Sequence, residues 1–430
     1  MIVNVIGAGL AGCEAAYQLS KRGVSVRLYE SKPMVKSPAH HENTFAELVC
    51  SNSLKSDDFS TASGLLKAEL RRLDSLLIKI ADEVKVPAGS ALAVDRELFT
   101  AKVTEYIKND KNIEIIPSLV EDWNNDEITI IATGPLTIGK LADNISEKLG
   151  GSLHFFDAAA PIVSGDSIDY SSAFVGDRYG KGTGDYVNCP LNKEEYLEFY
   201  KALIGAERAK LHDFEKNAVF EGCMPVEVMA ARGVDTLRFG PMRPVGFRDN
   251  NGEKPYAVVQ LRRENVAGDM FNIVGFQTNL TFPEQKRVFS LIPALKNAEF
   301  MRYGVMHRNS FINAPKVING YFRLKDNSPT FIAGQLSGVE GYVESIASGL
   351  MCGINAARLV EGKELIKLPS TTIIGALCRY LESDNADFQP MNANFGILPP
   401  LENKTRDKEK NKLLYSDRSL KDLEKVCSYI

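Results

Sequence analysis

Two of the seven cysteines lie where a reactive thiol would be expected. Cys50 follows a short apolar stretch and opens a turn of small polar residues, and Cys223 lies between Gly222 and the turn at Pro225. Both stand at the end of an element, where a thiolate can act as a nucleophile or as an acid–base group. A free cysteine is more often a small buried hydrophobic residue, and this interpretation stays open for both.

The other cysteines predict packing rather than cross-linking. Cys13 and Cys352 lie within helical patterns, which favours the core. The cysteine count is odd, and no pair has C-x-x-C or zinc-site spacing. The sequence therefore argues against a disulfide framework and predicts no metal site.

A glycine-rich turn near the start of the chain predicts a dinucleotide-binding site. An apolar run over residues 3–6 leads into the turn, and a good helix-forming segment follows it. The turn reads Gly7-Ala8-Gly9-Leu10-Ala11-Gly12. Gly7 allows a tight turn, Gly9 lets a pyrophosphate approach the backbone, and Gly12 lets the helix pack on the strand. The diphosphate would lie at the helix N-terminus, whose N–H groups favour an anion.

Glu30 ends the next predicted strand, over residues 24–29, and lies 18 residues beyond Gly12. An acidic side chain at this point accepts hydrogen bonds from the adenosine ribose. A glycine triplet alone is weak evidence, and a glycine-rich turn in another α/β domain is the alternative. The strand, triplet, helix, strand and acid in register make the prediction specific.

Two later apolar runs, residues 128–133 and 330–333, also read as buried strands that close on a glycine. The second run leads into a segment with a strong helix pattern. A strand that ends on a glycine just before a helix N-terminus is a second arrangement that can face a phosphate or a flavin. The candidate cofactor contacts at these ends are Gly134, Gly334, Gln335, Gly341 and Tyr342.

Three such elements from both ends of the chain predict one FAD-binding domain in the α/β class, Rossmann-like and of the glutathione-reductase type, with an inserted α+β domain. We expect the FAD-binding domain over residues 1–160 and 317–430, and the insertion, on the substrate or RNA side, over 161–316. No second G-x-G-x-x-G occurs, so a separate domain for NADPH is not expected.

Helical patterns outside these motifs are expected over four segments. They cover residues 64–82, 96–109 with Asp95 as N-cap, 193–206, and 402–425. The irregular segment 31–58 shows no clear periodicity, which is typical of segments that contact ligands.

The composition is that of an ordinary globular protein, with 44% hydrophobic and 25% charged residues among 430. No apolar run reaches the ~18 residues that a membrane span needs, and the chain opens directly on a strand, so we expect no signal peptide and a cytoplasmic protein. The net charge of −4 gives no general nucleic-acid signature, so any RNA contact must be a local patch.

Several motifs together resemble one family. They are residues 7–12, 38–40, 47–53, 220–225, 307–309, 334–335 and 340–345. The chain is similar to the TrmFO family, the folate- and FAD-dependent tRNA (uracil-5-)-methyltransferases, which are shorter relatives of the GidA/MnmG wobble-uridine enzymes. The resemblance runs from residue 1 to about 400, and the two cysteine segments are its most specific part.

The resemblance implies methylation of a uridine at carbon 5 in the T-loop of tRNA. Methylenetetrahydrofolate would supply the carbon, reduced FAD the two electrons, and NADH or NADPH would be the electron source. Carbon 5 of uracil is a poor nucleophile, so a thiolate first adds to carbon 6 and a second group later removes the proton from carbon 5. The resemblance places Cys50 and Cys223 at the flavin. Their roles stay open, and we favour Cys223 as the nucleophile.

Substrate contacts are expected from a polar cluster between apolar segments, His307, Arg308 and Asn309, and from Arg232. His40 and His41 could be cofactor contacts or turn residues. Other arginines could hold RNA phosphates, although scattered arginines usually form a solvated face. They are Arg238, Arg243, Arg248, Arg262, Arg263, Arg302 and Arg323.

Three alternatives remain at this point. The same chemistry could act on a ribosomal RNA uridine, or the chain could be a non-catalytic FAD-containing RNA-binding protein. An FAD oxidoreductase acting on a small metabolite is the third, and it would have no need for two cysteines. The implied partners are tRNA through its T-arm and folate, with no stable protein partner and no membrane.

Overall fold

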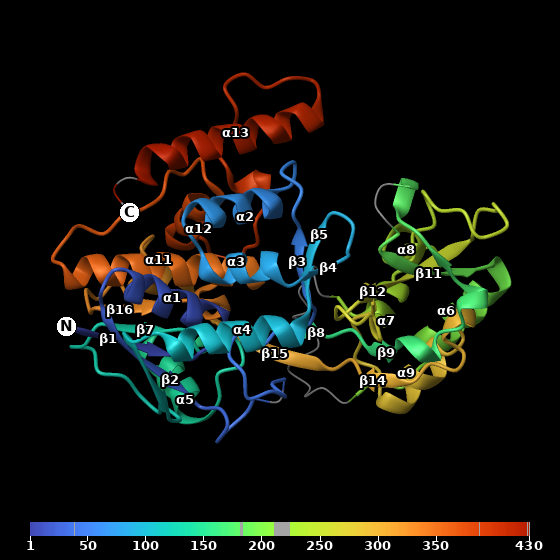
Figure 1. Ribbon diagram of the computed structural model, residues 1–430, viewed down its shortest axis with the longest axis horizontal. Helices are drawn as coiled ribbons and strands as arrows, with labels where there is room; N and C mark the ends of the chain where they lie inside the picture. The colour runs from blue at the N-terminus through green and yellow to red at the C-terminus, as the bar shows by residue number, and fades with distance from the viewer. Residues whose placement is uncertain (38, 181–183, 210–223, 387, 428, 430) are drawn as a thin grey trace.

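The computed structural model describes residues 1–430 except 38, 181–183, 210–223, 387, 428 and 430. Two β-sheets, each with its own helices and its own apolar core, make up most of the described chain (Figure 1). The first sheet lies on the side of both termini, and the second lies on the opposite side.

Five parallel strands form the first sheet, in the order β16-β7-β1-β2-β6. They are β1 (Ile2–Ile6), β2 (Ser25–Glu30), β6 (Ile113–Pro117), β7 (Thr129–Ile131) and β16 (Thr330–Ile332). β1, the first strand of the chain, pairs with β7, and β7 pairs on its other side with β16 from the C-terminal part of the chain. Strands from both ends of the chain thus share one parallel sheet, and the predicted Rossmann-like α/β fold is confirmed.

Three helices of this half begin where the sequence predicts a cap or a glycine. They are α1 (Leu10–Lys21), α4 (Arg96–Asn109) and α11 (Tyr342–Val360), whereas α5 (Gly139–Lys148) is a helix that the sequence analysis does not predict. Asp95 caps α4 by accepting the N–H of Leu98, as predicted. α1 and α11 pack closely against each other, which places two helix N-termini beside the sheet.

The helix predicted over residues 64–82 is wrong in one respect, because it is two helices. α2 (Ala62–Arg72) ends before Asp74, whose φ of 57° breaks the helix, and Ser75 then caps α3 (Leu76–Glu83). Both helices bury leucines on the same core, so the periodicity continued across the break. Asp74 is neither Gly nor Pro, the residues that signal such a turn most strongly.

Six antiparallel strands form the second sheet, in the order β10-β11-β12-β13-β9-β14. They are β9 (Ile162–Ser164), β10 (Phe174–Val175), β11 (Tyr186–Leu191), β12 (Ala257–Arg263), β13 (Met270–Ile273) and β14 (Phe300–Arg302). Their helices are α6 (Lys193–Ile204), α7 (Val226–Ala230), α8 (Thr236–Phe239) and α9 (Phe282–Phe289). This sheet is the inserted part predicted from the sequence, and the exact boundaries of the domains stay a prediction.

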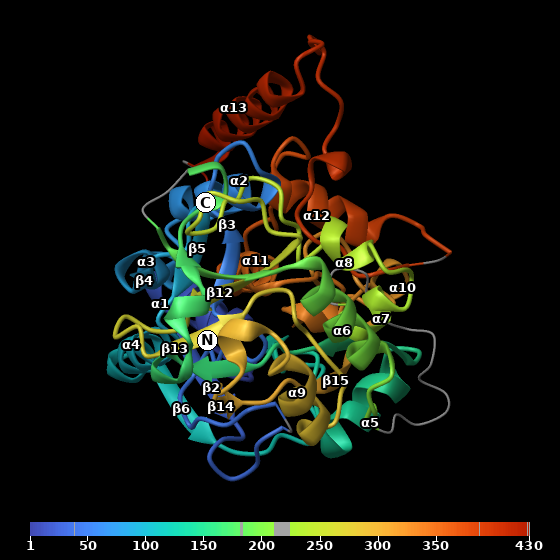
Figure 2. The ribbon, with the colours of Figure 1, turned by 90° about the vertical axis from the view of Figure 1, so that its right-hand side faces the viewer.

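Two smaller β-structures connect these parts. β8 (Ser152–Ala158) and β15 (Met306–Ile312) pair antiparallel between the two sheets (Figure 1), and a small sheet joins β3 (Ser53–Ser56), β5 (Ala91–Val94) and β4 (Lys85–Val86). The remaining helices are α10 (Ala314–Val317), α12 (Ile373–Glu382) and α13 (Lys408–Cys427). Figures 1 and 2 both show α13 at one outer edge of the molecule. None of the helices within the described residues has the length and apolar character to cross a bilayer.

Candidate cofactor and thiol site

The three glycines of the turn between β1 and α1 have different surroundings. A Cβ on Gly7 would lie 2.7 Å from the carbonyl oxygen of Ala132, and a Cβ on Gly12 would lie 1.8 Å from that of Gly7. A Cβ on Gly9 would meet nothing within 4 Å of the described protein. Gly7 and Gly12 therefore serve packing, whereas Gly9 faces open space at the N-terminus of α1, where a diphosphate would approach.

Glu30 closes this turn from the end of β2. Its buried carboxylate accepts the N–H of Ala8 at 2.8 Å and that of Lys32 at 2.9 Å. Each carboxylate oxygen has two acceptor positions, so capacity remains for ribose hydroxyls. A cavity of about 110 Å³ opens beside it. Its lining includes Ile6, Gly9, Tyr29, Glu30, Lys32 and Thr133. These residues fit the adenylate half of FAD.

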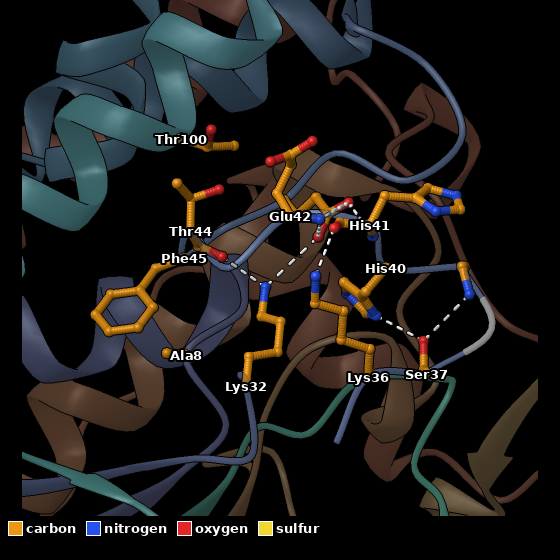
Figure 3. Close-up of polar contacts among 12 residues, drawn as sticks. Ala8, Lys32, Lys36, Ser37, His40, His41, Glu42, Thr44, Phe45 and Thr100 are labelled. Carbon is orange, nitrogen blue, oxygen red and sulfur yellow. Dashed lines mark hydrogen bonds and ion pairs between the residues drawn. The ribbon is translucent and has the colours of Figure 1, made fainter. Parts of the chain in front are cut away.

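The irregular segment after β2 is ordered by a buried ion pair, shown in part in Figure 3. The Lys32 ammonium lies 3.5 Å from the Glu47 carboxylate and donates to the carbonyl of Thr44. Glu47 also accepts the N–H of His41. Lys32, Glu47 and His40 line the same cavity as Glu30, and the segment that they belong to leads the chain to Cys50.

His40 lies beside Ser37, whose hydroxyl is 2.6 Å from the ring Nδ1 (Figure 3). Burial lowers the pKa of His40, which favours the neutral ring at neutral pH. His41 lies outside the cavity lining and uses its backbone carbonyl to accept from Lys36. Of the two histidines, only His40 is placed to meet a cofactor.

Cys50 is held by Tyr342, at the first turn of α11. The Cys50 sulfur lies 2.9 Å from the Tyr342 hydroxyl, which also accepts the backbone N–H of Cys50 at 2.8 Å and that of Ser51 at 3.2 Å. Burial, and then Asp157, raise the pKa of Cys50 to about 12, so the thiol form dominates at neutral pH. Cys223 lies outside the described residues, whereas Cys13 and Cys352 are fully buried, as predicted.

The segment around Cys50 lies at the junction between the two cores. Arg96 of α4 pairs with Glu264, which follows β12, at 3.0 Å and donates to the carbonyl of Leu48 at 2.6 Å. Asn52 donates to the carbonyl of Arg263 and accepts from Arg262. These contacts fix the thiol's segment to both halves of the molecule.

Glycines and acids surround the N-terminus of α11. Gly334 donates its N–H to Ser348 at 2.7 Å, and Gln335 donates to the buried Glu340. Burial, and then Asp157, raise the pKa of Glu340 to about 8. Gly341 has a φ of 120°, which favours glycine. The described geometry leaves the roles of Gly134, Gly334, Gln335 and Gly341 toward a cofactor as predictions.

The polar cluster of β15 is only partly open to a ligand. His307 lines a second cavity, which shares Leu136, Thr137 and Ile138 with the first. Among the described residues, its ring Nε2 is buried without a hydrogen-bond partner, and burial lowers its pKa to about 4. Arg308 lies opposite Phe156 in the β15–β8 ladder, and Asn309 is buried.

Arg232 lies apart from this cluster. It is exposed after α7 and lines a separate depression with Met229, Asp235 and the exposed Phe239. The structure therefore does not place Arg232 and His307 in one cavity. Their roles toward a substrate stay predictions.

Several arginines suggested as phosphate contacts instead make hydrogen bonds or ion pairs within the protein. Arg262 is buried and donates to Asn52 and Ser51, so its assignment as a phosphate contact is wrong. Arg302 donates to the carbonyl of Val49, and Arg323 donates to backbone carbonyls at 327 and 328. Arg238 pairs with Asp235 and covers the ring of Tyr256. Arg243 and Arg248 are exposed and Arg263 is half-buried.

Sequence reasoning missed the residues that position the site, notably Lys32, Arg96 and Glu264. They sit in no motif, and their partners lie far away in the chain or in an irregular segment. The expected cofactor contact of Tyr342 stays a prediction, and the contact of its hydroxyl with Cys50 is one that the sequence does not predict.

The fold and the site define a Rossmann-like protein of the FAD-binding type, with an antiparallel sheet inserted into the dinucleotide-binding half. The family described as Glucose inhibited division protein A matches residues 2–364. The chain belongs to this family and, within it, to the TrmFO family.

Curated relatives match along nearly the whole chain. "Methylenetetrahydrofolate--tRNA-(uracil-5-)-methyltransferase TrmFO" of Acetivibrio thermocellus is 57% identical over 429 residues, 99% of this chain and 98% of that protein. The protein of the same name from Natranaerobius thermophilus is 56% identical over 428 residues, again 99% and 98%.

A solved structure, GidA of Aquifex aeolicus in its form II crystal, supports the fold. It has a TM-score of 0.73 at 17% identity and covers 99% of this chain and 73% of its own. The form I crystal gives a TM-score of 0.68 at 16% identity, with 99% and 78% covered.

Proposed function

We propose that this chain is a methylenetetrahydrofolate- and FAD-dependent tRNA (uracil-5-)-methyltransferase that acts on a T-loop uridine. The observation that carries the proposal is the 57% identity, over 99% of the chain, to a relative named for this activity. The glycine turn, Glu30 and the half-buried Cys50 support it, because they supply a dinucleotide site and a thiol within one fold. A cytoplasmic location and NADH or NADPH as electron source belong to the same proposal.

FAD would be held by the turn at residues 7–12, by Glu30, and by the glycine-ended strands at 134 and 334. When bound and reduced, it supplies the two electrons that convert the methylene carbon of the folate into a methyl group. The protein's part is to exclude water from the site and to orient the two thiols. Gly9 leaves the diphosphate its space, and the Glu30 carboxylate fixes the turn through Ala8.

Cys223 is proposed to add to carbon 6 of the uracil ring, and Cys50 to exchange the proton at carbon 5. The raised pKa of Cys50 supports this division. A thiol that is protonated at neutral pH is a poor attacking nucleophile, but its thiolate is a strong base once formed. His307, Arg308, Asn309 and Arg232 are the proposed substrate contacts.

The test is methyl transfer by the purified, flavin-loaded chain. We would incubate it with methylenetetrahydrofolate, NADPH or NADH, and either a tRNA transcript or ribosomal RNA, and then analyse the nucleosides. We expect 5-methyluridine in the tRNA only. Product in ribosomal RNA alone would overturn the substrate, and no product in either RNA would overturn the reaction.

A further inference from the structure

The geometry around Tyr342 shows which atom donates in its hydrogen bond with Cys50. The phenolic oxygen of Tyr342 lies 2.8 Å from the Cys50 nitrogen and 3.2 Å from the Ser51 nitrogen. A backbone N–H can only donate, so the oxygen accepts from both. A phenol has one proton to donate, and the sulfur of Cys50, at 2.9 Å, is its third neighbour. The O–H therefore donates to the sulfur.

We propose that Tyr342 is a positioning residue whose O–H donates to the Cys50 sulfur, so that it stabilises the thiolate form and, in the thiol form, leaves the S–H to point away from Tyr342. The proposal deepens the proposed function and rests on Cys50 being the group that exchanges the proton at carbon 5. The Cys50 thiol first loses its proton to water. In the exchange step the C–H bond at carbon 5 breaks, its electron pair stays in the uracil ring, and the proton forms a new S–H bond on Cys50. Tyr342 keeps its own proton throughout, so no bond to Tyr342 forms or breaks.

The surroundings of the pair suit this role. Burial, and then the charge of Cys50, raise the pKa of Tyr342 well above its ordinary value, so the phenol remains a donor. Two N–H donors on the phenolic oxygen polarise its O–H and strengthen the bond to sulfur. The charged groups facing Cys50 are Asp157 of β8, Arg96 of α4, Glu340 before α11 and Arg262 of β12. Those facing Tyr342 are Arg96 and Arg302.

Tyr342 stands on a helix, and Cys50 lies in an irregular segment that hydrogen bonds hold on both sides, as a positioning contact requires. Tyr342 begins α11, and that helix packs along α1. The segment after Cys50 is fixed by the buried Lys67 ammonium, which donates to the carbonyls of Leu54, Ser56 and Ser63 at 2.8 to 3.0 Å. The sulfur-to-phenol geometry is therefore set by the fold before any substrate binds.

The experiment measures the reactivity of Cys50 in the full, flavin-loaded chain. Tyr342→Phe removes the O–H and keeps the ring. Tyr196→Phe is the matched control, because the Tyr196 hydroxyl donates to the carbonyl of Val234 at 2.6 Å in the other core. Each protein is treated with iodoacetamide from pH 7 to 9.5, and alkylation of the Cys50 peptide is followed by mass spectrometry.

We expect Tyr342→Phe to lower the Cys50 alkylation rate about tenfold at each pH, the effect of losing one hydrogen bond to a charged group. Tyr196→Phe should react like the parent. An unchanged or faster rate in Tyr342→Phe would overturn the proposal, because it would mean that the sulfur does not depend on this donor.

A second variant tests the proposal independently in case Tyr342→Phe does not fold. Replacing Tyr342 by 3-fluorotyrosine keeps the size of the side chain and makes the phenol a stronger donor, so Cys50 should be alkylated faster, and a rate equal to the parent's would overturn the proposal. Alkylation needs neither RNA nor folate. If the parent methylates tRNA while Tyr342→Phe alkylates normally, this inference fails and the proposed function stands. If the parent does not methylate, the function fails and the thiol measurement still decides the role of Tyr342.

Discussion

At the residue scale, the glycines of the turn at residues 7–12 have different roles, some in packing and one beside the expected cofactor. A Cβ on Gly9 would meet nothing within 4 Å among the described residues, whereas a Cβ on Gly12 would collide with the backbone oxygen of Gly7. We predict that Gly9→Ala folds but loses most of its flavin, because the new methyl group occupies the approach of the diphosphate. The measurement is the flavin-to-protein ratio, which should be about one in the parent.

Gly12→Ala is the matched comparison. Its Cβ would lie 1.8 Å from a backbone oxygen, so the turn must open, and we expect a loss of about 1–3 kcal/mol in the free energy of unfolding. If Gly9→Ala keeps the flavin of the parent, the cavity beside Gly9 does not receive the diphosphate.

Glu340 gives a residue-scale prediction about pH. Burial raises its pKa to about 8, so between about 4.3 and 8 the folded chain keeps a proton that the unfolded chain has lost. Stability then falls as pH rises, by at most about 1.4 kcal/mol per pH unit. His307 acts the other way, because burial lowers its pKa to about 4 and stability rises with pH until about 6.5.

The effects of Glu340 and His307 on the unfolding free energy oppose each other below pH 6.5. The effect of Glu340 is therefore best measured between pH 6.5 and 8, where His307 no longer contributes. Over this window we predict that the unfolding free energy of the parent falls by about 2 kcal/mol more than that of Glu340→Gln, which carries no titrating group. Urea titrations at several pH values would measure both. Equal slopes for the two proteins would show that Glu340 ionises normally in the folded chain.

At the scale of elements, α4 offers a buried and an exposed ion pair on one helix. Arg96 joins α4 to Glu264 of the inserted part and has little exposure, whereas Lys102 pairs with Glu83 at the surface. We predict that Glu264→Gln costs about 3 kcal/mol in unfolding free energy, because it leaves a buried guanidinium without its counter-charge. Glu83→Gln should cost less than about 1 kcal/mol.

Chemical unfolding of the two variants side by side tests this difference. Glu264→Gln should also lower the alkylation rate or change its pH dependence at Cys50, since Arg96 holds the carbonyl of Leu48. Similar losses in the two variants would contradict the view that the buried pair ties the thiol's segment to the inserted sheet.

The elements also show what the sequence could predict. The turn at 7–12, Glu30 and the cap at Asp95 depend on neighbours within a few residues of sequence or on one strand–helix unit, so local chemistry specifies them. The contact of Cys50 with Tyr342 joins residues 292 positions apart, and no periodicity records such a pair. The break at Asp74 was missed because burial of leucines continued on both sides of it.

At the scale of the whole molecule, two halves with separate cores meet around the thiol. The half with the parallel sheet carries the dinucleotide turn, and the half with the antiparallel sheet carries Arg232, between α7 and α8. Cys50 lies where Arg96, Asn52 and Glu264 link the two halves. In the proposed function, the cofactor would approach this junction from one half and the RNA from the other.

The net charge of −4 predicts that RNA binding depends on a few local cations, and each phosphate contact contributes to the salt dependence through release of counterions. We predict that Arg232→Ala weakens tRNA binding and reduces the slope of log affinity against log salt by about 0.7–0.9. Arg72→Ala is the control, because Arg72 of α2 pairs with Glu424 of α13, on the side of the first sheet (Figure 1). Binding measured across salt concentrations separates the two variants. If the slope stays the same in Arg232→Ala, the exposed end of α7 does not contact phosphate, and the RNA must approach the thiol across another face of the inserted sheet.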